Sequence, residues 1–230
     1  MVSIVVIFTN YGPYHLSRLA AFQKKSHQLN WDVVGIELSS SEITYPWKAE
    51  VENFTGNLIS VISNQPVEEV QPTLLIHKLF SVLSRINPDV ITIAGYANYG
   101  MFSTLLWSIW HRKPAILLSA SKEDDAPRSR LSEIIKRWIL KGYKAALVGG
   151  KPQKAYLIKL GMNPNSIFTG YNVVGNHEFH PEKINSLPIP HQKPYFLAIN
   201  RFVAKKNLST LISSYGNYRQ TAGINAWDLV

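Results

Sequence analysis

Two cations stand at the front of a strand–loop–helix unit late in the chain, in residues 198–208, AINRFVAKKNL. Arg201 follows the expected strand directly, and Lys206 comes five positions later, at the expected start of a helix. Both cations and the free N–H groups of a helix N-terminus can converge on one set of oxyanions. This suits a diphosphate, because fixed positive charge stabilises the negative charge that grows on a diphosphate leaving group. We therefore predict Arg201 and Lys206 as catalytic residues.

A second group of polar residues follows earlier strands, in the segments TNYGPYH, GYANYG and SASKEDDAPRSRL. Open α/β sheets bind ligands beyond the carboxyl ends of their strands. Local structure offers an alternative in each segment, namely a strand-to-helix turn, a glycine turn, and helix capping by acidic residues. The residues predicted to bind substrate share this place after a strand, and they are Gly12, His15, Asn98, Ser121 and Asp125.

The sequence offers little to a metal or a cofactor. There is no cysteine, which excludes disulfides, thiolate metal sites and a cysteine nucleophile. His177 and His180 are close in sequence, but no matching ligand accompanies them. No Walker loop, G-x-S-x-G elbow or full G-x-G-x-x-G motif occurs. We expect neither a metal site nor a cofactor.

The elements that must position these residues alternate between apolar strands and amphipathic helices. Such alternation predicts an α/β fold with a Rossmann-like, doubly wound parallel sheet. The expected strands cover residues 2–8, 31–38, 57–63, 88–95, 115–121, 145–150 and 166–171.

Two of the expected helices carry wide apolar surfaces. Phe102, Leu105, Leu106 and Ile109 align on one helix, and two tryptophans widen its surface, so we expect this helix to be well buried. The helix over residues 129–141 is expected to turn an inner face to the core, made of Leu131, Ile134, Ile135, Trp138 and Ile139. Its other side is basic, which favours a solvated face and leaves open docking on an anionic membrane.

The composition and the hydrophobic periodicity of the sequence change after residue 175. Residues 1–175 form the expected first domain, and residues 176–193 are proline-rich and lack periodicity, which indicates a linker. Residues 194–230 open with the expected strand YFLAIN, continue with a helix from about Asn207, and close on WDLV, the start of another strand. A typical domain has about 100–150 residues, so we expect this second domain to be truncated.

Composition narrows the class of protein. The 230 residues are 46% hydrophobic and 17% charged, a balance typical of globular proteins. The net charge of +9 favours phosphate-bearing ligands, anionic membrane surfaces or nucleic acid. The first residues do not read as a signal peptide, and no apolar run reaches the roughly 20 residues of a membrane span. We expect a soluble, cytoplasmic protein, with peripheral membrane contact left open. Nucleic acid is not an expected partner, because aromatic residues are not interleaved with the basic ones.

The segment FLAINRFVAKKNLSTLI resembles the opening of the second domain in retaining glycosyltransferases of the GT-B fold, family four. In that family a strand is followed by Gly-Arg-Leu, and a lysine comes five residues after the arginine. Arg201 and Lys206 match these positions, whereas Asn200 and Asn207 stand where the family commonly has glycine.

The first domain is similar to the same family in two places. TNYGPYHLSRL resembles the family's N-terminal glycine loop, and AALVGGKPQKAYLIKLGMNPNSIFTGYNVV resembles the closing region of its first domain. There the family has Asn-Gly-Val-Asp. This chain reads Asn172, Val173, Val174 and Gly175, so the aspartate is absent.

The resemblance implies two Rossmann-like domains, with a nucleotide-diphosphate sugar bound mostly by the second and an acceptor sugar or lipid mostly by the first. Arg201 and Lys206 would neutralise the diphosphate, and Gly12 and His15 would border the reacting sugar. Asn98, Ser121 and Asp125 would be looser cleft residues. Such enzymes need no metal.

The family's later acidic motif, two Glu separated by seven residues, would lie beyond Val230. We therefore expect the 230-residue chain to lack transferase activity alone. The alternative is a non-catalytic remnant or binding module that docks on a membrane surface or a partner.

Overall fold

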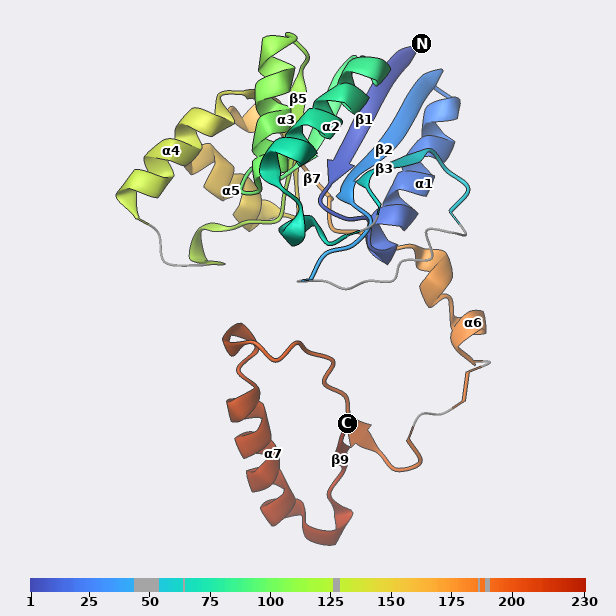
Figure 1. Cartoon of the computed structure of the whole chain (residues 1–230). Helices are drawn as coiled ribbons and strands as arrows, with labels where there is room; N and C mark the ends of the chain where they lie inside the picture. The colour runs from blue at the N-terminus through green and yellow to red at the C-terminus, as the bar shows by residue number, and fades with distance from the viewer. Residues whose placement is uncertain (44–53, 64, 126–128, 186, 189–190) are drawn as a thin grey trace. The chain divides into compact units, whose positions relative to one another are not determined.

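The structure is a computed structural model of the chain, and it describes residues 1–43, 54–63, 65–125, 129–185, 187–188 and 191–230 (Figure 1). The contacts divide the chain into two compact units, Met1–Gly175 and Asn176–Val230, called unit 1 and unit 2 here. Each unit is described by itself.

Unit 1 is built on a seven-stranded sheet in which every pairing is parallel. The strand order is β3-β2-β1-β4-β5-β6-β7. The strands from β1 to β3 are thus added toward one edge of the sheet and those from β4 to β7 toward the other, so the strand order reverses between β1 and β4. This confirms the predicted α/β, doubly wound parallel fold. The strands are β1 (Val2–Phe8), β2 (Trp31–Ser39), β3 (Leu58–Ile62), β4 (Val90–Ala94), β5 (Ala115–Ser119), β6 (Tyr143–Val148) and β7 (Ile167–Thr169).

Helices connect these strands and begin at recognisable residues. Proline occupies the first turn of α1, α2 and α5, where its missing N–H costs no hydrogen bond. Asn98 and Ser129 cap α3 and α4 with their side chains. The helices are α1 (Pro13–His27), α2 (Pro72–Ile86), α3 (Tyr99–Trp110), α4 (Arg130–Leu140) and α5 (Lys151–Lys159), with 3-10 turns η2 (Val67–Glu69), η3 (Glu123–Asp125) and η4 (Pro164–Ser166).

Each face of the sheet has its own apolar cluster, because side chains alternate along a strand. In β1, Val5 and Ile7 belong to the larger cluster, which includes buried residues of α2, α3 and α5. Ile4, Val6 and Phe8 belong to a smaller cluster with Leu16 and Leu19 of α1, among others. The two clusters hold the carboxyl ends of the strands in fixed positions.

The predicted inner face of the helix over residues 129–141 is wrong for four of its five residues; the fifth, Ile139, packs against the larger apolar cluster. In α4 the exposed fractions are 68% for Leu131, 51% for Ile134, 50% for Ile135 and 68% for Trp138. Leu140, the last residue of α4, is buried. Helical periodicity finds an apolar stripe but does not say whether another element covers it.

The expectation of a well-buried α3 is also wrong in part. Trp107 is buried, but Trp110 is 85% exposed at the end of the helix. Phe102, Leu106 and Ile109 are exposed as well, on the side of α3 away from the sheet. The apolar surface of α3 is thus wider than the area that the sheet and α2 cover.

Unit 2 contains η5 (Asn176–Phe179), α6 (Pro181–Asn185), β8 (Tyr195–Phe196), η6 (Ala204–Lys206), α7 (Leu208–Ala222), η7 (Gly223–Asn225) and β9 (Asp228–Leu229). Strands β8 and β9 pair in parallel. The expected strand YFLAIN is shorter than predicted, since its regular pairing covers two residues; a further bond joins Ala198 N to Val230 O at 2.9 Å. Short helical turns also lie inside the predicted linker over residues 176–193.

None of the helices in the described ranges combines the length and the apolar character that crossing a membrane requires.

Candidate functional site

The loop between β1 and α1 lies at the point where the strand order reverses. Because β1 pairs with β4 and β4 with β5, the loops that follow these three strands share one edge of the sheet. In an open parallel sheet this edge is where ligands bind. The structure therefore brings together the three loops that carry Gly12, His15, Asn98, Ser121 and Asp125.

A buried carboxylate fixes the first of these loops. Glu37 of β2 has no exposed surface, and its Oε2 accepts a hydrogen bond from the backbone N–H of Tyr11 at 2.9 Å. Its Oε1 accepts from Ser60 Oγ at 2.6 Å. Burial raises the pKa of the Glu37 carboxyl, and the hydrogen bonds from Ser60 and Tyr11 oppose that rise. Asn10 Nδ2 also donates to the carbonyl of Ser39 at 3.2 Å.

Gly12 begins α1. Its carbonyl oxygen accepts from the N–H groups of His15 at 2.9 Å and Leu16 at 3.0 Å. Its φ of −72° is open to any residue, so the backbone conformation alone does not require glycine. Gly12 is buried, and its carbonyl closes the first turn of the helix at the loop.

His15 is held by its neighbours in one orientation. Its ring stacks on Phe8 with centroids 4.1 Å apart, and Nδ1 lies 3.2 Å from the carbonyl oxygen of Asn10. Because a carbonyl only accepts, Nδ1 carries the proton and Nε2 is left as an acceptor. Burial, and after it the charge of Arg18, lower the pKa of His15 from 6.5 to about 4. His15 is therefore a neutral imidazole at pH 7.

His15 also lines a mainly apolar cavity of about 450 Å³ on the α1 side of the sheet. Arg18 lies at this cavity: its Nη1 donates to the carbonyl of Tyr171 at 2.8 Å, and its guanidinium carbon lies 4.7 Å from the Tyr171 ring centre. Tyr11 is buried beside it and donates its hydroxyl to the carbonyl of Val6 at 2.8 Å. The cavity thus has one cation and one neutral imidazole among apolar walls.

The other predicted residues of unit 1 have local partners. Asn98 Oδ1 accepts from Gly100 N at 2.7 Å, which caps α3. Asp125 Oδ2, at the end of η3, accepts from the backbone N–H of Lys122, just before η3, at 2.8 Å. Ser121 is exposed, and its N–H donates to Ser119 Oγ at 3.3 Å. Asn98 thus caps α3, where the sequence offered a glycine turn, and Asp125 bonds locally at η3 while Ser129 caps α4. A role of either residue in binding stays a prediction.

Arg201 and Lys206 lie in unit 2, in one connection between β8 and α7. Lys206 ends η6, and its backbone N–H donates to the carbonyl of Val203 at 2.9 Å. Asn207 follows with φ 49° at the cap of α7, so the lysine stands just before the helix instead of in its first turn. Both Arg201 and Lys206 are exposed. Their role as a diphosphate pair stays a prediction.

Sequence reasoning missed Glu37, Arg18 and Tyr171. Glu37 had a signal, an acidic residue inside the apolar strand WDVVGIEL. The Arg18–Tyr171 contact joins residues 153 positions apart, and no sequence pattern marks it. In the described part of the chain, no group of three or more His, Cys, Asp or Glu side chains is arranged to hold a metal ion.

Comparison with known proteins shows what the fold resembles. No protein-family model matches the chain, and no curated protein matches it. Among solved structures, a UDP-N-acetylglucosamine 2-epimerase from Rickettsia bellii superposes with a TM-score of 0.57 at 15% identity, over 96% of this chain and 60% of that one. The lipopolysaccharide outer core galactosyltransferase WaaB gives 0.56 at 12%, over 99% and 67%.

Anabaena Alr3699/HepE in complex with UDP-glucose gives a TM-score of 0.58 at 9% identity, over 100% of this chain and 69% of that one. At such identities the likeness shows the fold, which is that of GT-B proteins. The chain spans 60% to 62% of the length of three UDP-N-acetylglucosamine 2-epimerase structures that it matches.

Proposed function

We propose that the chain forms part of a retaining glycosyltransferase that moves a sugar from a nucleotide-diphosphate sugar to an acceptor sugar or lipid. The observation that supports this most is the fold likeness over 96% to 100% of the chain to proteins named for UDP-sugars or for galactosyl transfer. Retention rests on the family resemblance of the segment that carries Arg201 and Lys206.

In this proposal Arg201 and Lys206 neutralise the diphosphate as it leaves, because charge develops on its oxygens when the bond to the sugar breaks. His15 and the backbone at Gly12 border the reacting sugar. A neutral imidazole with a free acceptor nitrogen can take a hydrogen bond from a sugar hydroxyl without adding charge. Asn98, Ser121 and Asp125 lie on the acceptor side. No metal or cofactor takes part.

A second candidate is a nucleotide-sugar epimerase, favoured by the epimerase structures among the matches. Both candidates bind a nucleotide diphosphate sugar. The transferase moves the sugar to an acceptor, whereas the epimerase inverts one carbon of the sugar and leaves the nucleotide diphosphate sugar as its product. Incubation with UDP-N-acetylglucosamine, followed by NMR of the sugar, separates them: inversion at the carbon that bears the acetamido group marks an epimerase.

Binding tests what the two candidates share. Calorimetric titration should show that the chain binds UDP. Arg201→Gln with Lys206→Gln should lower the affinity for UDP at least 10-fold, since a hydrogen bond to a charged group contributes about 1.5–3 kcal/mol. The matched control is Arg219→Gln, which removes one charge from the last turn of α7 in the same unit.

UDP affinity that is equal in the double variant and in the unaltered chain would contradict the assigned role of the pair. Uridine that binds as tightly as UDP would contradict a diphosphate site altogether.

A further inference from the structure

The exposed apolar side chains of α3 and α4 lie on two neighbouring helices, and together they are called the α3–α4 face here. A Cβ placed on Gly142 would lie 3.1 Å from Ile109 Cδ1 and 3.3 Å from the Ile139 carbonyl oxygen, so Ile109 of α3 lies against the end of α4. Figure 1 shows the two helices beside each other, in green and yellow. The face consists of large side chains at least half exposed: Leu106, Ile109, Trp110, Leu131, Ile134, Ile135 and Trp138.

The positive charge of the chain is concentrated in the same part of the sequence. Residues 99–166 contain twelve Lys or Arg and four Asp or Glu, a net +8, against +9 for the whole chain. Local cations accompany the acids: Glu133 pairs with Lys136 at 2.7 Å, and Glu123 pairs with Lys159. Positive charge therefore remains in excess over residues 99–166, the stretch of the chain that contains α3 and α4.

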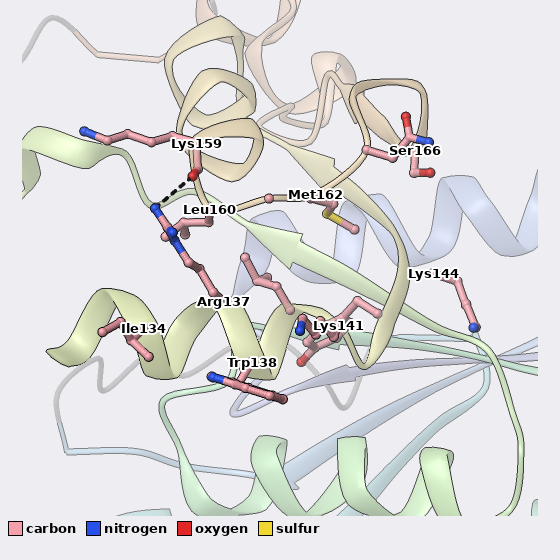
Figure 2. Close-up of a pocket in the computed structure, with 13 residues that line it drawn as sticks. Ile134, Arg137, Trp138, Lys141, Lys144, Lys159, Leu160, Met162 and Ser166 are labelled. Carbon is pink, nitrogen blue, oxygen red and sulfur yellow. Dashed lines mark hydrogen bonds between the residues drawn. The ribbon is translucent and has the colours of Figure 1, made fainter. Parts of the chain in front are cut away.

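A hollow of about 550 Å³ adjoins this face at the end of α4 (Figure 2). Arg137, Lys141 and Lys144 line it, and Ile134 and Trp138 supply apolar wall. Lys141 Nζ lies 4.1 Å from the centre of the Trp138 ring. Within the described ranges, none of these three cations forms an ion pair with a carboxylate. The hollow therefore offers several cations to an anion next to an exposed indole.

We propose that the α3–α4 face docks on an anionic lipid bilayer. Trp138, Ile134 and Ile135 would enter the boundary between headgroups and acyl chains, where tryptophan and aliphatic residues gain most from burial. Arg137, Lys141 and Lys144 would meet lipid phosphates, each basic residue contributing about 1 kcal/mol near such a surface. This docking does not depend on the proposed transferase activity.

Charge favours the bilayer over a second copy of the chain as the occupant of this face. Two copies joined through their α3–α4 faces would bring like charges together, which disfavours association. An anionic bilayer instead complements the basic residues and the apolar ones at the same time. The exposed apolar side chains of the α3–α4 face also favour a role in binding, because soluble monomers rarely expose large apolar patches.

Co-sedimentation of the chain with vesicles tests the proposal. We expect binding to an equimolar mixture of phosphatidylglycerol and phosphatidylcholine, and little to phosphatidylcholine alone. Lys141→Gln with Lys144→Gln should lower the partition coefficient roughly 30-fold, from about 1 kcal/mol for each cation. The matched control, Lys24→Gln with Lys25→Gln, removes two exposed charges from the last turn of α1 and should leave the binding unchanged.

Trp138→Ser with Ile135→Ser tests the apolar part and should lower binding at least as far as the lysine changes. Both side chains are at least half exposed, so the variant is expected to fold; circular dichroism checks this. The proposal is overturned by equal binding to both lipid mixtures, by no binding to either, or by equal loss in the control. Two further results overturn it: a lipid-free dimer that the Trp138 variant abolishes, and binding of inorganic phosphate without binding of vesicles.

Discussion

Glu37 is a carboxylate without exposed surface inside a parallel strand, and it receives a backbone N–H from Tyr11 and a hydroxyl from Ser60. Leaving a buried donor without its acceptor costs about 1–3 kcal/mol. Removing this carboxylate would leave both donors without an acceptor. The hydrogen bond from Tyr11 N–H to Glu37 therefore favours the observed conformation of the loop after β1. Glu37 thereby ties the backbone at residues 10–12 to β2, and the loop's shape depends on a residue distant from it in sequence.

His15 gives a prediction about pH. Its folded pKa of about 4 lies below the ordinary 6.5, so between these values the unfolded chain binds a proton that the folded chain does not. The stabilising contribution is present above about pH 6.5 and is lost as pH falls toward 4. In His15→Phe, which keeps a ring to stack on Phe8, the loss in unfolding free energy between about pH 7 and pH 4.5 should be smaller by roughly 2 kcal/mol.

Urea unfolding at the two pH values measures this difference. Glu37 has a raised pKa and contributes with the opposite sign, but it is common to both proteins and cancels between them. Tyr14→Phe, which alters an exposed ring on the same helix, is the matched control. Parallel pH dependence in His15→Phe and the unaltered chain would show that the folded state holds His15 with an ordinary proton affinity.

At the scale of elements, α1 packs closely against β2 at Gly35, which has no side chain. A Cβ added to Gly35 would collide with Leu19 of α1, and would lie 3.0 Å from Leu58 Cδ1 and 3.2 Å from the Tyr11 hydroxyl. We expect Gly35→Ala to lower the free energy of unfolding by about 1–3 kcal/mol, the usual cost of overpacking a core. Chemical denaturation of the 230-residue chain, followed by circular dichroism, measures it.

The control for this change is Gly216→Ala in α7, where no atom lies within 4 Å of the added Cβ. Alanine inside a helix is about 0.5–1 kcal/mol more favourable than glycine, so helix content should stay equal or rise. If Gly35→Ala were as stable as the unaltered chain, α1 would have room to shift along β2, and the close approach would not fix its position.

Sequence alone predicted the elements of unit 1 well and their partners less well. The seven strands were evident because buried parallel strands are continuous β-branched runs, as in VSIVVIF. The stripe of Ile134, Ile135 and Trp138 was also evident, but its exposure was not, since periodicity describes a helix and burial depends on its neighbours. For the candidate site, the loops followed from strand ends, whereas the Glu37 carboxylate and the Arg18–Tyr171 contact depend on tertiary packing.

At the scale of the whole chain, the two units differ in what holds them together. Unit 1 has two apolar clusters with many fully buried side chains. Among the described residues of unit 2 none is buried. Its main apolar contact is a partly exposed aromatic group, in which the ring centroid of Phe196 lies 5.2 Å from that of Tyr218 and 5.4 Å from that of Trp227. Ordering a backbone residue costs about 1–2 kcal/mol, which such limited burial offsets only weakly.

Hydrogen exchange should therefore separate the units. In the 230-residue chain at neutral pH, backbone amides of β1 and β4 lie in the middle of a sheet with apolar clusters on its faces, and they should exchange only through global unfolding. Amides of α7 should exchange at least 100-fold faster, because local opening of this helix exposes little apolar surface that was buried before. Mass spectrometry of peptic peptides resolves the two regions. Protection of α7 equal to that of β1 would mean that unit 2 is stabilised by contacts beyond its own apolar group, and adding UDP or anionic vesicles would then show whether a ligand supplies them.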